Sequence, residues 1–244
     1  MSRESVDGYV DEMDRLKQNL IIANRILDME NLARPMGHIS VRIPGTDDFF
    51  ITRSIAPGLA VLNDIVVCNT EGKVVRGKYS ETFGEVWAHA AVYRKREDVN
   101  SVAHTHSVHV ISLSMTGSTL LNLGVEALKT GFGTIGLYDK LCMLEDREVG
   151  EEVAGLVGEN KAVILRGHGA VVVGKSIESC TMACIYLENA ARYQLMASST
   201  GKLAVFSEEE KKPIVEFLKK NRSRAGAGSS DGRAWEYYKS KVKK

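Results

Sequence analysis

The sequence predicts an α+β fold in which helices cover an antiparallel or mixed sheet. Short apolar segments are joined as hairpins more often than through helical crossovers, and the helical patterns cluster before and after the strand-rich part. The chain also lacks the glycine-rich loop that opens a dinucleotide or phosphate site in many doubly wound sheets. These observations favour a layered sheet covered by helices over a doubly wound parallel sheet.

The composition limits the class of protein and its partners. The 244 residues suffice for one large domain or two small ones, and a hydrophobic content of 44% allows a sizeable core. A net charge of +1, without a long Lys/Arg stripe, argues against a nucleic-acid partner. The four cysteines form no Cys-x-x-Cys pair, and we find no signal core or membrane-spanning segment. We therefore expect a cytoplasmic protein with no membrane partner.

The first half of the chain opens with an amphipathic helix. Val10, Met13, Leu16 and Leu20 follow helical spacing, and Pro35 prevents the helix from continuing further. Alternating apolar and polar residues separated by turn residues then indicate strands. The expected elements are a helix over 7–29, strands over 37–42, 49–52, 64–69 and 73–76, and a helix over 85–94.

The second half begins with the strand that carries His104 and His106. Ser176 is placed to cap a long helix near the end of the strand-rich part. We expect residues 1–221 to form one domain, and residues 222–244 to form a flexible linker with an aromatic and basic C-terminal segment. The expected elements are a helix over 108–115, short strands and loops over 120–144, a helix over 145–157, strands over 161–165 and 170–173, and helices over 177–197 and 207–220.

Two histidines one residue apart, His104 and His106, suggest a metal site. On an extended strand, residues i and i+2 point to the same face, so both imidazoles can reach one ion. Neutral imidazole is the commonest metal ligand in proteins, although the pair alone also fits ordinary surface or core histidines. Gly167 and Gly169 flank His168 and allow other groups to approach it closely, which makes His168 the candidate third ligand.

Glu85 is the best carboxylate candidate, because it begins a helix just before the histidine strand. There it could ligate a metal or act as an acid/base. A helix also favours an acidic residue in its first turn for electrostatic reasons alone, and spacing does not decide between these interpretations. His89, His38 and His109 fit packed or surface histidines better than metal ligands on spacing alone.

Together, these segments resemble the class II aldolase/adducin family. The resemblance covers most of the chain, from about residue 15 to residue 200. It rests on Glu85-x-x-x-His89, on the segment 99–107 that contains both strand histidines, on the segment 165–169 around His168, and on Gly-His-Ile-Ser-Val-Arg at 37–42. It implies an α/β/α sandwich around a mostly antiparallel sheet, and a homotetramer with active sites near the subunit interfaces.

The resemblance also implies an enzyme that acts on a small molecule with one divalent metal ion per subunit. The ligands carried over from the family are His104, His106 and His168. Glu85 matches the family's catalytic acid/base and is also a candidate ligand. Zn²⁺ or Mn²⁺ is expected, with Mg²⁺, Fe²⁺ and Co²⁺ as alternatives. Adducin-like structural members lack these histidines, whereas all three are present here.

The residues just before Glu85 depart from the sugar-phosphate aldolases of the family. In those enzymes Pro-Ser-Ser precedes the glutamate and the serines hold phosphate, but here the segment is Thr82-Phe83-Gly84. His38 replaces an asparagine that also contacts phosphate. Because phosphate needs several donors to offset its desolvation, a phosphorylated sugar is disfavoured. We predict instead that His38, Phe83 and Gly84 line the site of a flatter, less polar substrate.

Two arginines are candidates for binding a substrate carboxylate. Arg53 lies in a loop near the expected pocket, whereas Arg42 also fits a purely structural strand position. Aldolases of the family use a tyrosine from a neighbouring subunit as a proton donor. Residues 120–134 contain no tyrosine, so Tyr237 or Tyr238 is the C-terminal candidate, and we assign the catalytic role to Tyr238. Both tyrosines also fit simple hydrophobic docking.

This combination is similar to a decarboxylating branch of the family, whose members act on hydroxylated aromatic or pyridine carboxylates or on keto acids. We therefore predict a metal-dependent carbon–carbon lyase that decarboxylates a hydroxy-aromatic, hydroxypyridine, keto or hydroxy acid through a metal-stabilised enolate. An aldolase that cleaves a sugar or a hydroxy-keto acid is the first alternative. An iron-dependent oxygenase and a non-catalytic adducin-like module are the others.

Overall fold

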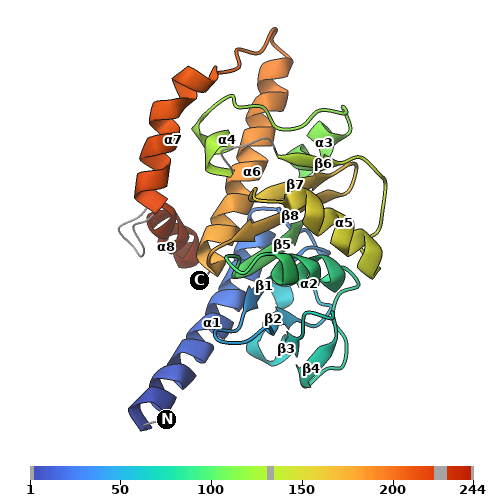
Figure 1. Cartoon of the computed structure of the whole chain (residues 1–244), viewed down its shortest axis with the longest axis vertical. Helices are drawn as coiled ribbons and strands as arrows, with labels where there is room; N and C mark the ends of the chain where they lie inside the picture. Colours follow the sequence, from blue (N-terminus) through green and yellow to red (C-terminus); the bar gives the residue numbers. More distant parts are fainter. Residues whose placement is uncertain (1–2, 131–134, 223–229, 243–244) are drawn as a thin grey trace.

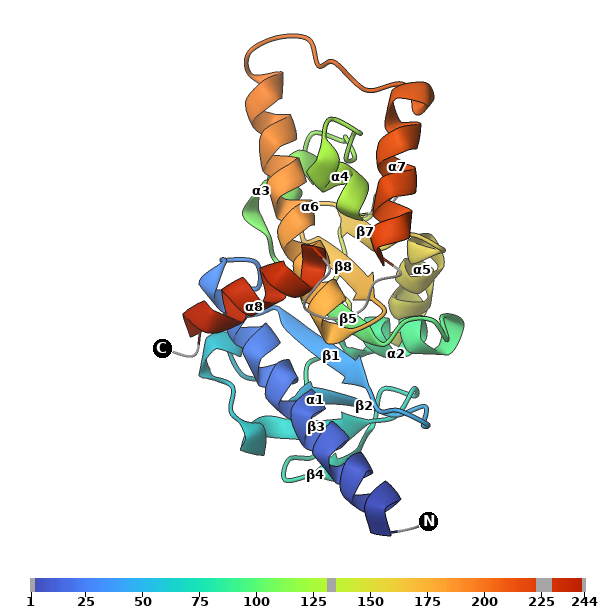
Figure 2. The same cartoon turned by 90° about the vertical axis from the view of Figure 1, so that its left-hand side faces the viewer.

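The computed structural model describes residues 3–130, 135–222 and 230–242. In these residues a central sheet lies between two layers of helices, as Figure 1 and the rotated view in Figure 2 show. This is the α/β/α sandwich that the sequence predicts.

One sheet of eight strands forms in the described part of the chain. Its order is β4-β3-β2-β1-β5-β8-β7-β6, and every neighbouring pair is antiparallel except β6 and β7. The prediction of a mostly antiparallel sheet is therefore confirmed. The strands are β1 (His38–Arg42), β2 (Phe49–Thr52), β3 (Ile65–Cys68), β4 (Val74–Gly77), β5 (Ser101–Thr105), β6 (Gly136–Tyr138), β7 (Ala162–Leu165) and β8 (Gly169–Gly174).

Helices cover both faces of this sheet (Figure 1). They are α1 (Arg3–Met29), α2 (Val86–Lys95), α3 (Val108–Ser114), α4 (Val125–Thr130), α5 (Arg147–Val157), α6 (Ile177–Ser198), α7 (Glu208–Arg222) and α8 (Ser230–Val242). As expected, Ser176 caps α6, and its side chain accepts a hydrogen bond from the amide of Ser179. Among the helices described, none combines the length and the apolar content needed to cross a membrane.

Alternation along β5 divides the interior into two hydrophobic cores. Val102 packs with residues of α2 and α5, whereas Ala103 packs with residues of α1 and α6. Because side chains two positions apart share a face, His104 points to the same side as Val102. The central strand of the sheet therefore presents the first histidine toward the layer formed by α2 and α5.

The region over 120–144 differs in part from the expectation of short strands and loops. The strand β6 is present, but residues 125–130 form the short helix α4. Ala127 and Leu128 are buried, so packing against the core stabilises a segment that is too short to show helical periodicity in the sequence. Residues 131–134 of this region lie outside the described residues.

The C-terminal end of the chain forms the helix α8, which lies across α1 and α6 (Figure 2). Trp235 is 3% exposed in the core formed with α1 and α6, and the Tyr186 hydroxyl donates to Asp231 at 3.1 Å. The Gly/Ser/Arg-rich part of the predicted linker spans residues 222–232, but residues 230–232 are helical, because α8 packs against α1 and α6. Residues 223–229 lie outside the description, and the domain boundary at residue 221 stays a prediction.

Candidate metal centre

The three predicted histidines come together at one end of the sheet. His104 is on β5, His106 lies one residue beyond the end of β5, and His168 lies in the turn between β7 and β8. One nitrogen from each ring lies within 4.8 Å of the corresponding nitrogens of the other two. The ring centroids are 4.6 to 5.1 Å apart, and the rings meet edge to face. This arrangement leaves space for one ion between three nitrogens.

Two glycines let neighbouring segments approach the backbone of the histidine strand. Gly169 opens β8, and a Cβ atom there would lie 2.0 Å from the carbonyl oxygen of Thr105. A Cβ atom at Gly37 would lie 2.8 Å from the carbonyl oxygen of His104. In addition, Gly167 has a φ of +70°, which favours glycine in the turn that carries His168. Close backbone contacts and a positive φ therefore favour glycine at these positions beside the histidines.

We expect Gly169→Ala to destabilise the protein strongly. The new methyl group would overlap a backbone oxygen, so β5 and β8 would have to separate, at a cost of about 3 kcal/mol or more. Gly155→Ala is the matched control, because it lies exposed in α5 and the nearest atom to its Cβ position is 3.9 Å away. Urea unfolding should show a lower midpoint for Gly169→Ala and an unchanged or higher one for Gly155→Ala. Equal midpoints would contradict this account of the turn.

The ring nitrogens of the trio fit a metal ion. Nε2 of His104, Nε2 of His106 and Nδ1 of His168 are all buried and have no hydrogen-bond partner. The other nitrogen of His104 lies 3.2 Å from the carbonyl oxygen of Ala170, which can accept its proton and leave Nε2 as a free lone pair. Buried polar atoms rarely lack a partner, and one nitrogen from each of these rings lies within 4.8 Å of the others, so the cluster is suited to hold a cation.

Electrostatics keep the trio in the neutral form that binds metals. Burial is the largest cause that lowers the pKa of each ring. Neighbouring histidines add to this effect at His104 and His106, and the pKa of His106 is lowered to about 4. Since imidazole must lose its proton before it binds an ion, the trio is ready for a metal at neutral pH.

Glu85 lies at the N-terminus of α2, beside His38. The carboxylate oxygen Oε2 is 3.6 Å from Nε2 of His38, and Glu85 is 8% exposed. Burial is the largest influence on its pKa and would raise it. The interactions with His38, the Glu85 backbone amide and the charge of His106 outweigh burial and lower the pKa to about 2. The side chain is therefore ionised at neutral pH, as a base or a metal ligand must be.

The wall next to Glu85 is apolar on one side and acidic on the other. The rings of His38 and Phe83 stack with centroids 4.0 Å apart, and both residues are buried. Gly84 is exposed, and a Cβ atom at this position would lie 3.0 Å from Cγ of Glu145. The sequence did not single out Glu145, which lies about 60 residues away in the chain and reaches Gly84 only through the fold.

His89 belongs to a buried network rather than to the metal trio. Its Nδ1 lies 2.7 Å from the hydroxyl oxygen of Ser40, which is 2.8 Å from the hydroxyl of Tyr93. Burial lowers the pKa of His89 well below its ordinary value, so the ring is neutral. His109 instead lies 2.6 Å from Glu188, apart from the trio. Neither histidine is brought among the candidate ligands.

The two predicted carboxylate-binding arginines have partners within the chain. The Arg42 guanidinium donates to the carbonyl oxygens of Val99, Tyr93 and Arg96, at 2.9 to 3.0 Å. This corrects the substrate-binding interpretation of Arg42, because its fork holds the C-terminal end of α2. Arg53 donates from Nε to Asp64 at 2.8 Å and lies over the ring of Tyr79. A substrate contact of Arg53 stays a prediction.

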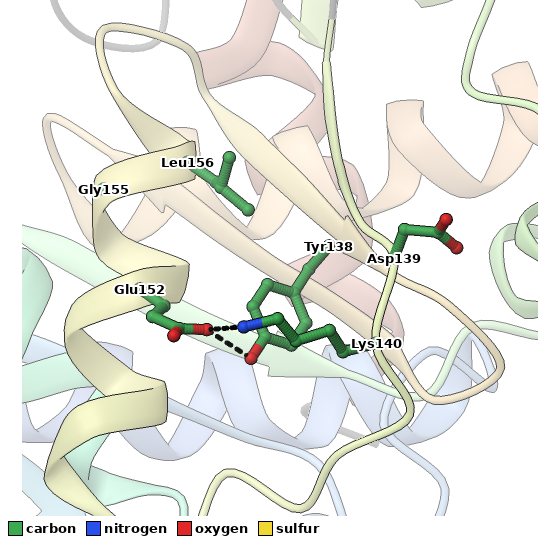
Figure 3. A pocket seen from close by; sticks show the side chains of 6 residues that line it. All are labelled: Tyr138, Asp139, Lys140, Glu152, Gly155 and Leu156. Atoms are coloured by element: carbon green, nitrogen blue, oxygen red, sulfur yellow. Dashed lines mark hydrogen bonds and ion pairs between the residues drawn. The ribbon is translucent and has the colours of Figure 1, made fainter.

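Tyr238 is not near the metal trio within one chain. It packs against the core beneath α1 and α6, whereas His104 faces the opposite layer. A catalytic role for Tyr238 therefore requires another copy of the chain. A cavity of about 470 Å³ lies away from the trio, between β6 and α5 (Figure 3). There Glu152 accepts hydrogen bonds from Tyr138 at 2.6 Å and from Lys140 at 2.7 Å, so its polar groups are already paired.

An α/β/α sandwich that brings three histidines together at one end of its sheet, each with an unpartnered ring nitrogen, has the arrangement of a protein that holds a divalent metal. Residues 18–195 match the model of the class II aldolase and adducin N-terminal domain, and the chain belongs to this family. The family resemblance seen in the sequence is confirmed.

Relatives of known name include both aldolases and decarboxylases. A putative aldolase class 2 protein of Caulobacter vibrioides is 29% identical over 68% of the chain, and the match spans 65% of that protein, just under two thirds of its length. A 3,4-dihydroxyphthalate decarboxylase of Arthrobacter keyseri is 26% identical, over 76% of the chain and 79% of the relative. The solved L-fuculose 1-phosphate aldolase from Glaciozyma antarctica has the same fold, with a TM-score of 0.80, 24% identity, and coverage of 96% of this chain and 91% of that one.

Proposed function

We propose that the protein is a decarboxylase of a hydroxy-aromatic, hydroxypyridine, keto or hydroxy acid. The observation that carries this proposal is the wall beside Glu85, where the His38–Phe83 stack and Gly84 stand in place of phosphate-binding side chains. The carboxylate of Glu145 lies next to Gly84 and would repel a phosphate dianion there more strongly than a singly charged carboxylate. A planar substrate fits this wall better than a phosphorylated sugar, and a related decarboxylase is among the chain's relatives.

His104, His106 and His168 would hold the metal, for which Zn²⁺ and Mn²⁺ are the first candidates and Mg²⁺, Fe²⁺ and Co²⁺ the others. When bound, a divalent ion supplies Lewis-acid stabilisation of negative charge on substrate oxygens. The hydrogen bond between His104 and the carbonyl of Ala170 orients the first of these rings. The open side of the trio, next to Glu85, is where we place the substrate.

Glu85 would move one proton in the reaction. Its lowered pKa leaves it ionised, so it first takes a proton, from the hydroxyl of a hydroxy substrate or from solvent for a keto acid. The bond between the carboxylate and the adjacent carbon then breaks, the electron pair stays on that carbon, and CO₂ leaves. Glu85 returns the proton to this carbon, and a solvent proton restores the hydroxyl. The sum of these steps converts one substrate carboxylate anion and one proton into the decarboxylated product and CO₂.

We further propose that the protein acts in the cytoplasm as a homotetramer with active sites near the subunit interfaces. A catalytic Tyr238 would then serve the site of a neighbouring copy, because it is distant from the trio of its own chain. Tyr237 is 57% exposed beside it, so the aromatic end of α8 presents a surface to which another copy could bind.

A panel of substrates tests the reaction. The chain, loaded separately with Zn²⁺, Mn²⁺ and Mg²⁺, is given hydroxybenzoates, hydroxypyridine carboxylates, keto acids and ketose phosphates, with CO₂ and aldehyde measured in parallel. We expect CO₂ from one of the acids without O₂, and in D₂O the carbon that loses CO₂ should carry deuterium. Cleavage restricted to ketoses or hydroxy-keto acids would replace the proposal with an aldolase. Dependence on O₂ would indicate an oxygenase, and no turnover with full metal content would indicate a binding module.

A further inference from the structure

The loop between α1 and β1 contacts the backbone of both strand histidines. The carbonyl oxygen of Leu32 accepts a hydrogen bond from the amide of His106 at 2.7 Å. Five residues later, Gly37 lies so close to β5 that a Cβ atom would be 2.8 Å from the carbonyl oxygen of His104. The loop is therefore fixed on the end of the strand that carries two of the candidate ligands, and Arg34 lies between these two contacts.

Arg34 has an unusual backbone conformation. Its φ of +50° is in the left-handed region, which arginine rarely adopts, and the residue before a proline is normally extended. Neighbouring interactions hold it there: Leu32 and Ala33 are buried, and the carbonyl of Ala33 accepts from the amide of Gly37 at 2.7 Å. Strained residues that their surroundings hold in place are common at functional sites. The base of the Arg34 side chain is thus fixed beside the trio.

The Arg34 side chain is exposed and available. Among the residues that the structure describes, none forms a hydrogen bond or an ion pair with its guanidinium. Arg42 and Arg53, by contrast, are engaged with carbonyl oxygens and with Asp64. The loop that carries this free guanidinium is held at the end of β5 by the Leu32–His106 hydrogen bond and by the close approach of Gly37 to His104, so Arg34 borders the trio.

A guanidinium fork recognises a carboxylate with two parallel hydrogen bonds. A carboxylate that leaves as CO₂ loses its charge in the transition state, so a cation bound to it would stabilise the reactant more than the transition state. Arg34 is therefore suited to a carboxylate that stays on the molecule. We infer that Arg34 forms a subsite for a second, retained carboxylate, so that the preferred substrate is a dicarboxylate and the product is still an acid. This inference rests on the proposed decarboxylation.

Binding of two product-like ligands tests the subsite without turnover. The probes are 3,4-dihydroxybenzoate and catechol, which share the same diol and differ by one carboxylate. Calorimetric titrations use the metal-loaded wild type, Arg34→Gly, Arg34→Lys and Arg76→Ala. Arg76 is a matched control, because it is an exposed arginine on β4, four strands away from β5. Metal content is measured for each variant, so that loss of the ion is not mistaken for loss of the subsite.

We expect Arg34→Gly to weaken binding of the acid about 10-fold or more, with catechol changed less than about twofold. The affinity of Arg34→Lys for the acid should fall between those of the wild type and Arg34→Gly. The affinity of Arg76→Ala should match that of the wild type. Because glycine suits a φ of +50°, Arg34→Gly should keep or raise the melting temperature, which separates the loss from misfolding. Equal weakening of both ligands, or no weakening of either, would overturn the inference. Since the assay needs no CO₂ release, failure of the proposed reaction is detected separately.

Discussion

Replacing His168 with alanine should release the metal and abolish turnover. The three candidate nitrogens lie within 4.8 Å of one another, and removal of one leaves only two protein imidazoles facing the ion. Loss of a residue that only hydrogen-bonds to a metal ligand already lowers metal affinity about 10- to 100-fold. Loss of a ligand itself should lower the affinity further. We expect metal content measured by mass spectrometry to fall from one ion per chain to well below it after dialysis.

A second histidine variant provides the control for this experiment. His109 is also partly buried, but it pairs with Glu188 on α6 and lies outside the trio. His109→Ala should therefore keep its metal and its turnover, although it loses that hydrogen bond. If His168→Ala retained one tightly bound ion per chain, the trio would not be the metal centre. Circular dichroism of both variants would show that the difference does not come from unfolding.

Much of the fold follows from local patterns in the sequence. The strand pairs β1–β2 and β3–β4 are joined by short turns, so alternation and turn residues predict both strands and partners. The long helices α1 and α6 have caps or strong periodicity. The helix α4 was missed, because six residues are too few to show a period and its stability comes from burial. The helical character of residues 230–232 was missed because Ser, Asp and Gly are typical of a linker, whereas here they form the first turn of α8, which packs on α1 and α6.

The candidate site was predictable only in part. The pair His104 and His106 follows from strand geometry, but His168 lies about 60 residues further along the chain. Its approach depends on the pairing of β5 with β8, which brings Thr105 opposite Ala170. Spacing alone made His168 a plausible third metal ligand, and the family resemblance identified it as the matching residue. The structure supplies the physical reason, which is the close contact that Gly169 permits.

The arginines show what a sequence cannot reveal without tertiary contacts. Arg42 and Arg53 looked available, but Arg42 donates to carbonyls at and beyond the C-terminal end of α2, and Arg53 donates to a carboxylate 11 residues away. Arg34 was not singled out, because its value depends on a positive φ and on the contact of its loop with His106. The only signal in the sequence was an arginine before Pro35, close to the Gly-His-Ile-Ser segment.

Glu85→Gln should separate proton transfer from metal binding. Glutamine keeps the shape of the side chain next to His38 but can neither take nor return a proton. If Glu85 is the acid/base of the proposed reaction, kcat should fall about 10²- to 10⁴-fold while substrate binding changes little. Metal content should stay near one ion per chain, since the three histidines remain. Steady-state kinetics and metal analysis on the same preparation measure both quantities.

The Glu85→Gln experiment shows whether Glu85 acts as the acid/base or as a metal ligand. Glu81→Gln is the control, because Glu81 is exposed on the segment that leads to α2 and should leave kcat and metal content unchanged. If Glu85→Gln loses the ion to the same extent as His168→Ala, Glu85 is chiefly a ligand, and the proton must come from another group. If it keeps both the ion and the wild-type rate, Glu85 is neither. The lowered pKa, about 2, also implies that any loss of wild-type activity between pH 6 and about 4 arises from groups other than Glu85.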